Sequence, residues 1–240
     1  MHLVIRNRFL FVGGLLCGLM FACKGQPPES EARIISVYNK TMAPLKFTDS
    51  KWQSELSVQI SGAAEKSENQ LTVLSEWNED TLVFFFKVHD IDLRAYQHQK
   101  DHPRLYLDDM VEVLIDTQYE RDSCWSRTHI IYHVNLLGTK KDDRGSQTCE
   151  TNPEWDGKAK ISHGVIGTLN DTTDVDTGYM VSLFFPWDEI ERRPKEGLVM
   201  GINFANGDND GKGRQLYDWV GAWPMRSPQV FGELLLSQKQ

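Results

Sequence analysis

Short strand-like segments, separated by turn residues, recur along most of the chain and limit the folds open to it. In each segment, β-branched and aromatic residues dominate, and apolar side chains alternate with polar ones or form short continuous runs. Helical periodicity is weak. This density of short strands predicts an all-β fold, an antiparallel β-sandwich with short helical turns in its loops. The segments are 71–77, 81–90, 110–116, 128–138, 158–165, 178–186, 199–208 and 231–237.

The chain has 240 residues, of which 40% are hydrophobic, enough to bury one sizeable core. We therefore expect a single folded domain over residues 34–240. Within it, "WNED" (77–80) reads as a tight hairpin loop. "PWDEIERR" (186–193) predicts one helical turn after a strand, with Pro186 near its start, and "DLRAYQHQKDH" (92–102) predicts either a helical turn or a loop.

Residues 1–23 have the features of a secretory signal. Arg6 and Arg8 precede an apolar run that is too short to span a membrane comfortably. The run ends in "LMFAC", which resembles a bacterial lipobox, whose cysteine becomes the lipidated first residue of the mature protein. Cys23 would be that residue. The alternative is an uncleaved N-terminal anchor, and either interpretation exports the chain and tethers it to a membrane, the outer membrane being the expected location.

Residues 24–33 are polar and contain Pro27 and Pro28, which predicts a short flexible tether. Without Arg6 and Arg8, 24 Lys and Arg remain against 34 Asp and Glu, a formal charge of −10. An acidic surface repels nucleic acid, so we expect no nucleic-acid partner. It suits a neutral ligand, a cation or a partner protein.

Two cysteines remain after the signal, Cys124 and Cys149. An even pair in an exported chain favours a disulfide over a metal site or a catalytic thiol. The bond would close a loop worth about 3 kcal/mol in the chain-entropy model.

One strand carries a carboxylate in its middle. In "MVEVLID" (110–116), alternation places Val111, Val113 and Ile115 on one face and Glu112 on the other. A glutamate at this position is disfavoured in strands and costly to bury unpaired. It is therefore either solvated or held in place to bind a ligand.

The order of the segments along the chain resembles that of a known protein family. "LTVLSEWNEDTLVFFFKVHD", "DDMVEVLID", "YHVNLLGT", "GYMVSLFFPWDEI" and "GLVMGINFANGD" follow one another, and tryptophan and proline then precede "FGELLL". This order resembles carbohydrate-binding module family 9, a DOMON-like β-sandwich family, over about residues 35–237. The resemblance implies that a terminal sugar is bound in a slot between two aromatic rings, with polar groups at its hydroxyls.

The resemblance also implies roles for particular residues. Glu112 matches the carboxylate that accepts hydrogen bonds from sugar hydroxyls. Alternation in "YHVNLLG" places His133 and Asn135 on one face, where the family motif has arginine and asparagine at the sugar. Asn135 matches the asparagine of the family motif, so the resemblance implies that it contacts the sugar. His133 replaces the arginine of the motif and lacks its planar guanidinium and permanent charge.

The two aromatic rings of the sugar slot match the family pattern less well. Tyr106 stands where the family has its first tryptophan, and Met225 stands where it has the second. Methionine cannot supply a rigid ring, so we expect Trp223, two residues earlier, to form the second wall. Trp52 matches a tryptophan of structural role. We expect the other tryptophans without a place in the motif to be packing residues, namely Trp77, Trp155 and Trp187.

Relatives in this family also hold structural calcium. "NGDNDG" (206–211) offers Asn206, Asp208 and Asp210 at alternate positions, followed by a glycine. It is not an EF-hand, because Tyr217 stands where the bidentate glutamate would fall. The segment is either an oxygen-rich calcium loop or a polar turn.

Three functions compete. The first is non-catalytic binding of a saccharide by a membrane-tethered lipoprotein, with glycan-degrading enzymes or uptake machinery as partners. The second is a glycoside hydrolase, which needs two facing carboxylates. Asp116 lies four residues from Glu112 on one strand, about 13 Å, which is beyond either carboxyl spacing, so another acid such as Asp109 or Asp218 would have to supply the partner. The third keeps the fold and binds haem, through His133 and Met225, or a protein partner.

Overall fold

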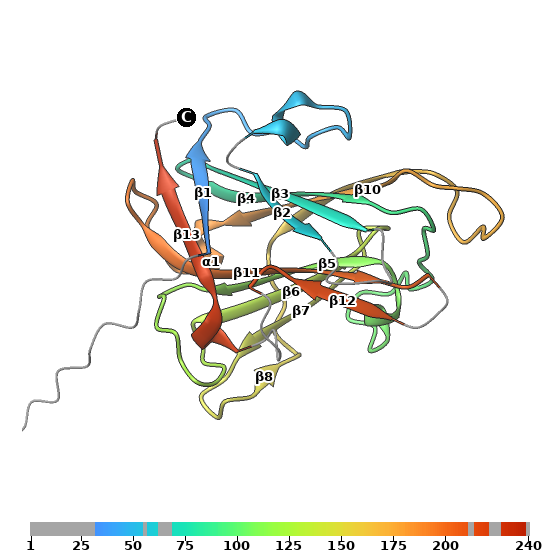
Figure 1. Ribbon diagram of the computed structural model, residues 1–240. Coiled ribbons are helices and arrows are strands. Elements are labelled where there is room, and N and C mark those ends of the chain that lie inside the picture. Colours follow the sequence, from blue (N-terminus) through green and yellow to red (C-terminus); the bar gives the residue numbers. More distant parts are fainter. Residues whose placement is uncertain (1–31, 55–56, 62–68, 211–213, 221–226, 239–240) are drawn as a thin grey trace, which may run out of the picture.

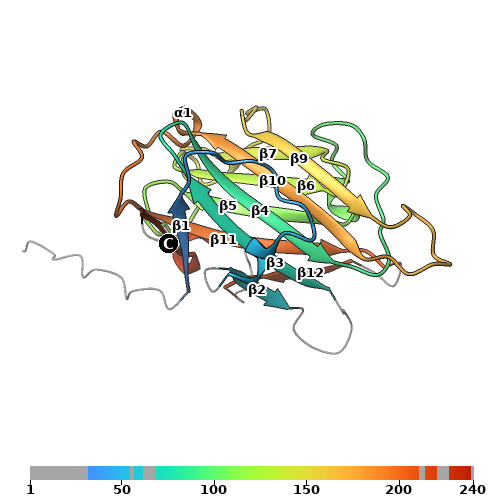
Figure 2. The ribbon, with the colours of Figure 1, turned by 90° about the horizontal axis from the view of Figure 1, so that it is seen from above.

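The computed structural model describes residues 32–54, 57–61, 69–210, 214–220 and 227–238, and shows one curled sheet whose two halves pack face to face (Figure 1). The predicted signal, residues 1–23, and residues 24–31 of the predicted tether lie outside this part, and the last predicted tether residue, Arg33, begins the first strand. Seen from above, β4, β10 and β9 cross over β5, β6 and β7 (Figure 2). The predicted all-β sandwich is confirmed.

The strands follow the chain as β1 (Arg33–Tyr38), β2 (Val58–Ser61), β3 (Gln70–Trp77), β4 (Thr81–His89), β5 (Met110–Asp116), β6 (His129–Asn135), β7 (Lys140–Gly145), β8 (Thr151–Asn152), β9 (Lys160–Ile166), β10 (Gly178–Pro186), β11 (Val199–Asp208), β12 (Gln215–Asp218) and β13 (Gly232–Ser237). In the described residues, helix is limited to the single turn α1 (Trp187–Ile190) and to the 3-10 turns η1 (Ser50–Gln53), η2 (Leu105–Leu107) and η3 (Pro228–Val230).

The hydrogen-bonded path through the sheet runs β8-β7-β6-β5-β11-β13-β1-β3-β4-β10-β9, with β12 on β11 and β2 on β3. Its pairs are antiparallel except at β1, which pairs in parallel with both β13 and β3. This strand joins the two halves at one side of the molecule, so the sandwich is closed there by backbone hydrogen bonds. The predicted antiparallel arrangement therefore holds apart from this seam.

Alternation along the strands divides the apolar side chains among three clusters. The largest lies between the two halves and includes Val111 and Val113 of β5, opposite Phe84 and Phe86 of β4. A second cluster on the outer face of β5, β6 and β11 includes Leu114 and Ile131. A third covers the outer face of β3 and β4. The outer face of the β5 half therefore carries a small apolar patch of its own beside its polar residues.

The strands predicted over 110–116, 178–186 and 199–208 are found with the predicted bounds. The hairpin at 77–80 is also confirmed, since Asn78 N–H donates to Thr81 O at 2.9 Å. Five strands were missed, namely β1, β2, β7, β8 and β12.

The segment 92–102 contains no helix, so the alternative of a loop is correct there. Cys124 and Cys149 are joined by the predicted disulfide, with their Cα atoms 5.1 Å apart. Within the described ranges, no helix has the length and apolar character needed to cross a membrane.

Candidate functional site

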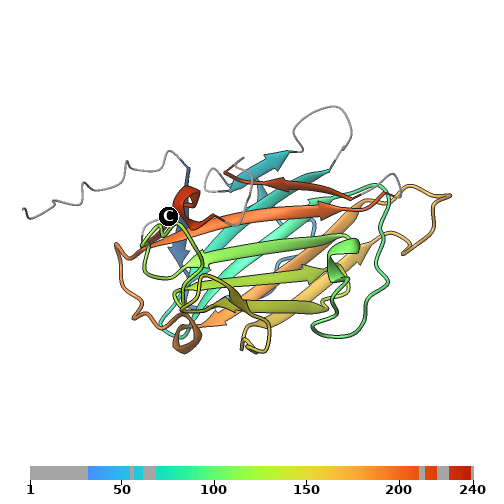
Figure 3. The same ribbon diagram turned by 90° about the horizontal axis from the view of Figure 1, so that it is seen from below.

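A row of side chains crosses the outer face of the β5 half, the layer shown from below in Figure 3. Residues directly opposite each other in antiparallel strands point to the same face. The pairing registers place Glu112 of β5 beside Ala205 of β11 on one side and His133 of β6 on the other. Asp218 of β12 and Lys141 of β7 extend the row at its two ends. The predicted neighbourhood of Glu112 and His133 is therefore present.

Glu112 lies at the centre of this row and is buried, with 1% of its surface exposed. Its Oε1 is 3.1 Å from Nδ1 of His133 and 3.3 Å from Nη2 of Arg214. The interpretation of Glu112 as a solvated strand residue is therefore wrong. A buried carboxylate is costly unless it is paired, and the guanidinium of Arg214 supplies the pairing charge.

Arg214 is the residue that sequence reasoning missed. It follows "GKG" in a stretch of sequence that matches no motif, but the pairing of β12 with β11 brings it next to Glu112 of β5. Its Cζ lies 5.5 Å from the ring centroid of Tyr106, so one guanidinium contacts both Glu112 and Tyr106. Arg214 thus supplies the fixed charge that His133 lacks.

Tyr106 belongs to η2 and is 47% exposed, a large aromatic surface beside the buried polar pair. Together, Tyr106, Arg214, Glu112 and His133 form a polar site with one aromatic wall, which we call the Glu112 site. The two residues expected to supply the opposite wall, Trp223 and Met225, lie outside the described residues. The haem-binding alternative depended on His133 and Met225, and it gains no support from the part of the chain that is described.

Asn135 lies at the end of β6 and is fully buried. Its Nδ2 donates to Gln97 O and to Asp108 Oδ2, both at 2.9 Å, and its Oδ1 accepts from the N–H groups of Leu137 and Thr139. These contacts use both amide hydrogens and both lone pairs. Asn135 therefore holds the loop before β5 against the β6–β7 turn, and its contact with a sugar stays a prediction.

A second acidic group lies at the ends of three strands. Asp90 follows β4, Asp109 precedes β5 and Asp208 ends β11. All three are buried, and each offers a carboxylate oxygen within 4.8 Å of the others. Asp109 is oriented by the N–H groups of Arg94 and Asn209, at 2.6 and 2.7 Å. We call Asp90, Asp109 and Asp208 the triple-Asp cluster.

The oxygens of the triple-Asp cluster fit a calcium ion, which takes six to eight oxygen ligands. Oδ2 of Asp90 and Oδ1 of Asn206 are buried, and neither atom has a hydrogen-bond partner among the described residues. Burial raises the pKa of Asp90 and of Asp109 well above the usual range, and the negative charges of neighbouring carboxylates raise both further. A cation bound by the cluster would offset this repulsion and favour the charged carboxylates.

The sequence placed the calcium ligands within one loop, at Asn206, Asp208 and Asp210. The structure instead brings Asp208 together with two aspartates distant in the chain, and Asp210 is not part of this carboxylate group. The sequence feature that could have identified the other two ligands is an aspartate directly at the end of a strand. Asp90 ends "FKVHD" and Asp109 begins "DMVEV", each directly beside a buried strand.

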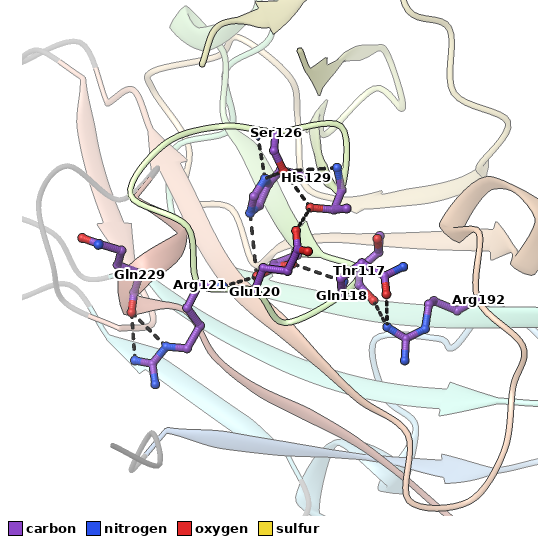
Figure 4. Close-up of polar contacts among 10 residues, drawn as sticks. Thr117, Gln118, Glu120, Arg121, Ser126, His129, Arg192 and Gln229 are labelled. Carbon is purple, nitrogen blue, oxygen red and sulfur yellow. Dashed lines mark hydrogen bonds and ion pairs between the residues drawn. The ribbon is translucent and has the colours of Figure 1, made fainter. Parts of the chain in front are cut away.

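A polar cluster at the opposite end of β5 and β6 contains serine, histidine and aspartate (Figure 4). Ser126 Oγ lies 2.9 Å from Nδ1 of His129, and Nε2 of His129 lies 3.7 Å from Asp116. The backbone N–H of Ser126 also donates to Nδ1, at 2.8 Å, and therefore uses the lone pair that a general base would need. Asp116 itself accepts the N–H groups of Gln118 and Arg121. This cluster stabilises the loop after β5 rather than forming a nucleophilic site.

Three of the tryptophans expected to be structural are buried, with the indole N–H bonded to a backbone carbonyl. Trp52 donates to Lys46 O, Trp77 to Ser237 O and Trp187 to Asn78 O. Trp155 is only partly buried, and it packs against the main core cluster and Tyr132. The prediction of a packing role is confirmed for all four.

Comparison with known proteins decides the family. The model of the family described as carbohydrate family 9 binding domain-like matches residues 46–239. The chain belongs to this carbohydrate-binding family. Members of family 9 are carbohydrate-binding modules and typically non-catalytic. No curated protein matches the chain.

Solved structures of family 9 modules share the fold. A family 9 module from Caldicellulosiruptor kristjanssonii in complex with cellotriose superposes with a TM-score of 0.65 at 17% identity, covering 87% of this chain and 95% of that one. A family 9 module from the same organism in complex with glucose gives a TM-score of 0.63 at 17% identity, covering 87% of this chain and 97% of that one. At this identity the likeness establishes the fold, and the ligands in those complexes belong to those proteins.

Proposed function

We propose that this family 9 chain binds the terminal sugar of a glycan, without catalysis, at the Glu112 site. The observation that supports this most strongly is the contact of one guanidinium, that of Arg214, with both the buried carboxylate of Glu112 and the exposed ring of Tyr106. It places an apolar platform and fixed polar groups side by side. That combination is what recognition of a sugar requires.

The chemistry of each part suits a sugar. The C–H face of a pyranose packs on an aromatic ring, so Tyr106 is the platform. Ring hydroxyls need paired donors and acceptors in a partly dry site. Arg214 donates, and Glu112 accepts while holding the guanidinium in place. Because Glu112 is buried, the sugar meets Tyr106 and Arg214 first, and it reaches the carboxylate at the base of the site.

We propose further that the domain is exported and tethered by a lipid on Cys23, with residues 24–33 as the spacer from the membrane. The apolar run and "LMFAC" support this. A tethered binding module would hold glycan near the cell for degrading enzymes or uptake machinery. Incorporation of labelled palmitate into the full chain, lost in Cys23→Ser, is the expected result. Labelling that survives Cys23→Ser would refute lipidation at this residue.

The triple-Asp cluster is proposed to hold a structural calcium ion. It lies at the strand ends that position the loop before β5, and Asp109 and the Glu112 site flank the start of the same strand. Calcium would therefore fix the segment that carries Tyr106 and Glu112. Its chemistry here is charge neutralisation, with no part in a reaction.

The proposed function is tested by screening the wild-type domain against an array of oligosaccharides that differ in linkage, including cello-, xylo-, malto- and laminari-oligosaccharides. Hits are then measured by calorimetry. We expect binding that competes with a free monosaccharide. Absence of binding to every glycan would refute the proposal, and turnover of a glycan that is lost in Glu112→Gln would favour the hydrolase hypothesis instead.

A further inference from the structure

A groove of about 460 Å³ lies at the far end of the row that contains Glu112. Its walls come from the segment around Lys100 and Pro103 and from the turn around Pro153 and Trp155, and Lys141 forms part of its lining. The volume is within the range of sites that bind small molecules. The groove is separate from the Glu112 site, but Lys141 belongs to the same row of side chains.

The position of the groove follows from the strand register. Lys141 is directly opposite His133, which is directly opposite Glu112, so all three point to one face. Adjacent strands are about 4.8 Å apart, which places the Lys141 backbone roughly 10 Å from that of Glu112. A sugar chain that starts at the Glu112 site and runs across β6 would reach the groove with a later unit.

The lining suits a neutral saccharide rather than an ion. Trp155, Pro103 and Pro153 offer apolar surfaces, while Glu154 and the lysines offer acceptors and donors. The positive charges of the two lysines are largely neutralised by ion pairs within the protein. Lys141 pairs with Asp143 at 2.9 Å, and Lys100 pairs with Asp156 at 2.6 Å. Apolar faces beside balanced polar groups are the pattern expected around a sugar ring.

The groove is also held in shape by contacts at the edge of β7. Asp101 N–H donates to Lys140 O at 2.9 Å, which fixes one wall to the strand. Lys140 Nζ donates to Gly157 O at 2.6 Å, which fixes the other. Trp155 packs edge-on against Tyr132, with ring centroids 6.0 Å apart. Little ordering is needed for a ligand to bind in a groove that is already formed.

We infer that this groove is a second saccharide subsite, which binds an inner unit of the glycan whose terminal sugar occupies the Glu112 site. The inference rests on the proposed function and specifies its ligand as an oligosaccharide rather than a single sugar. It gives Trp155 a binding surface in addition to its packing role.

The test compares affinity across chain length, from the monosaccharide to the hexasaccharide of the series that binds on the array, by calorimetry. We expect the hexasaccharide to bind roughly tenfold more tightly than the monosaccharide, a gain typical of one or two added contacts. In Trp155→Ala and in the milder Glu154→Ala with Lys100→Ala, the gain should shrink while monosaccharide affinity stays unchanged. Lys195→Ala, an exposed lysine outside the groove, is the control and should retain the gain.

The outcomes separate the two proposals. Equal affinity for the monosaccharide and the hexasaccharide, or a gain that survives in the groove variants, overturns the second subsite and leaves the Glu112 site intact. Absence of binding by any sugar overturns both. Because Trp155 packs on Tyr132, a thermal melt of each variant is recorded, and the doubly substituted surface variant decides the question if Trp155→Ala fails to fold.

Discussion

The Glu112 site and the triple-Asp cluster both bury carboxylates at strands β5 and β11, yet they neutralise the charge in opposite ways. Glu112 has protein partners, Arg214 at 3.3 Å and His133 at 3.1 Å. The triple-Asp cluster has three carboxylates together, with Oδ2 of Asp90 left without a hydrogen bond in the described structure. A buried charge must be paired or coordinated. The charge of Glu112 is therefore offset by protein groups, whereas on our proposal a bound cation offsets the charges of the triple-Asp cluster.

The largest expected difference between the two regions is their response to chelation. Removing calcium leaves three buried carboxylates to repel one another, so the free energy of unfolding should fall by about 4 kcal/mol relative to protein in a thousandfold excess of calcium over its Kd. For a domain of this size, that corresponds to a fall in Tm of roughly 10 °C. Thermal unfolding in EDTA and in added calcium measures it, and identical melting curves would show that the cluster holds no calcium.

The same region should show a pH dependence of defined sign. Without calcium, the raised pKa values of Asp90 and Asp109 mean that the folded state binds more protons than the unfolded state once pH rises above the ordinary aspartate value of about 4. The free energy of unfolding of the calcium-free protein should therefore fall as the pH rises from about 4 to the raised pKa values of Asp90 and Asp109. The stabilisation by calcium should grow over the same interval, and a gain that is equal at pH 5 and pH 8 would contradict this account.

Substituting one carboxylate of the cluster sharpens the comparison. Asp90→Asn keeps the oxygen that accepts the Asp92 N–H but removes a charge. Calcium-free protein should be at least as stable as the wild type, because repulsion is reduced, while most of the gain from calcium is lost. Asp92→Asn is the matched control, since Asp92 pairs with Arg94 outside the cluster. If Asp90→Asn responds to calcium as the wild type does, the ion is bound elsewhere.

At the Glu112 site, the geometry of the guanidinium can be tested without removing its charge. Arg214→Lys keeps a cation but loses the planar fork that spans Glu112 and Tyr106. We expect sugar affinity to fall about tenfold, as for the loss of a charge-assisted hydrogen bond, with no change in the response to calcium. Calorimetry with the best glycan measures the first effect, and wild-type affinity in this variant would assign Arg214 to stability alone.

The smallest expected effect is that of the aromatic platform. Tyr106 is half exposed, so Tyr106→Ala should change the free energy of unfolding by about 0.5 kcal/mol or less. Its sugar affinity should nevertheless drop several-fold, because an aromatic contact is worth about 1 kcal/mol. Tyr96→Ala is the control, since Tyr96 is more exposed and has no contact with Arg214 among the ring contacts described. Equal effects in the two variants would exclude Tyr106 from the slot.

Periodicity was sufficient to predict the central strands, because β4, β5, β10 and β11 are buried on the core face and read clearly as strands. It missed β7, whose sequence "KKDDRG" is charged apart from its final glycine, because its pairing with β6 and its ion pairs outweigh low strand propensity. Alternation predicted the face on which Glu112 lies. The position of Arg214 was not predicted, since it depends on the pairing of β12 with β11, and the triple-Asp cluster depends on strand ends that only the three-dimensional pairing brings together.

The central claim, that Glu112 serves a binding site for sugar, is tested most directly by calorimetric titration of the wild type and Glu112→Gln with the best glycan from the array. Glutamine preserves the shape but removes the charge that holds Arg214, so affinity should fall about tenfold or more, while the calcium-induced rise in Tm is retained. A variant that remains folded and binds sugar as tightly as the wild type would contradict the account.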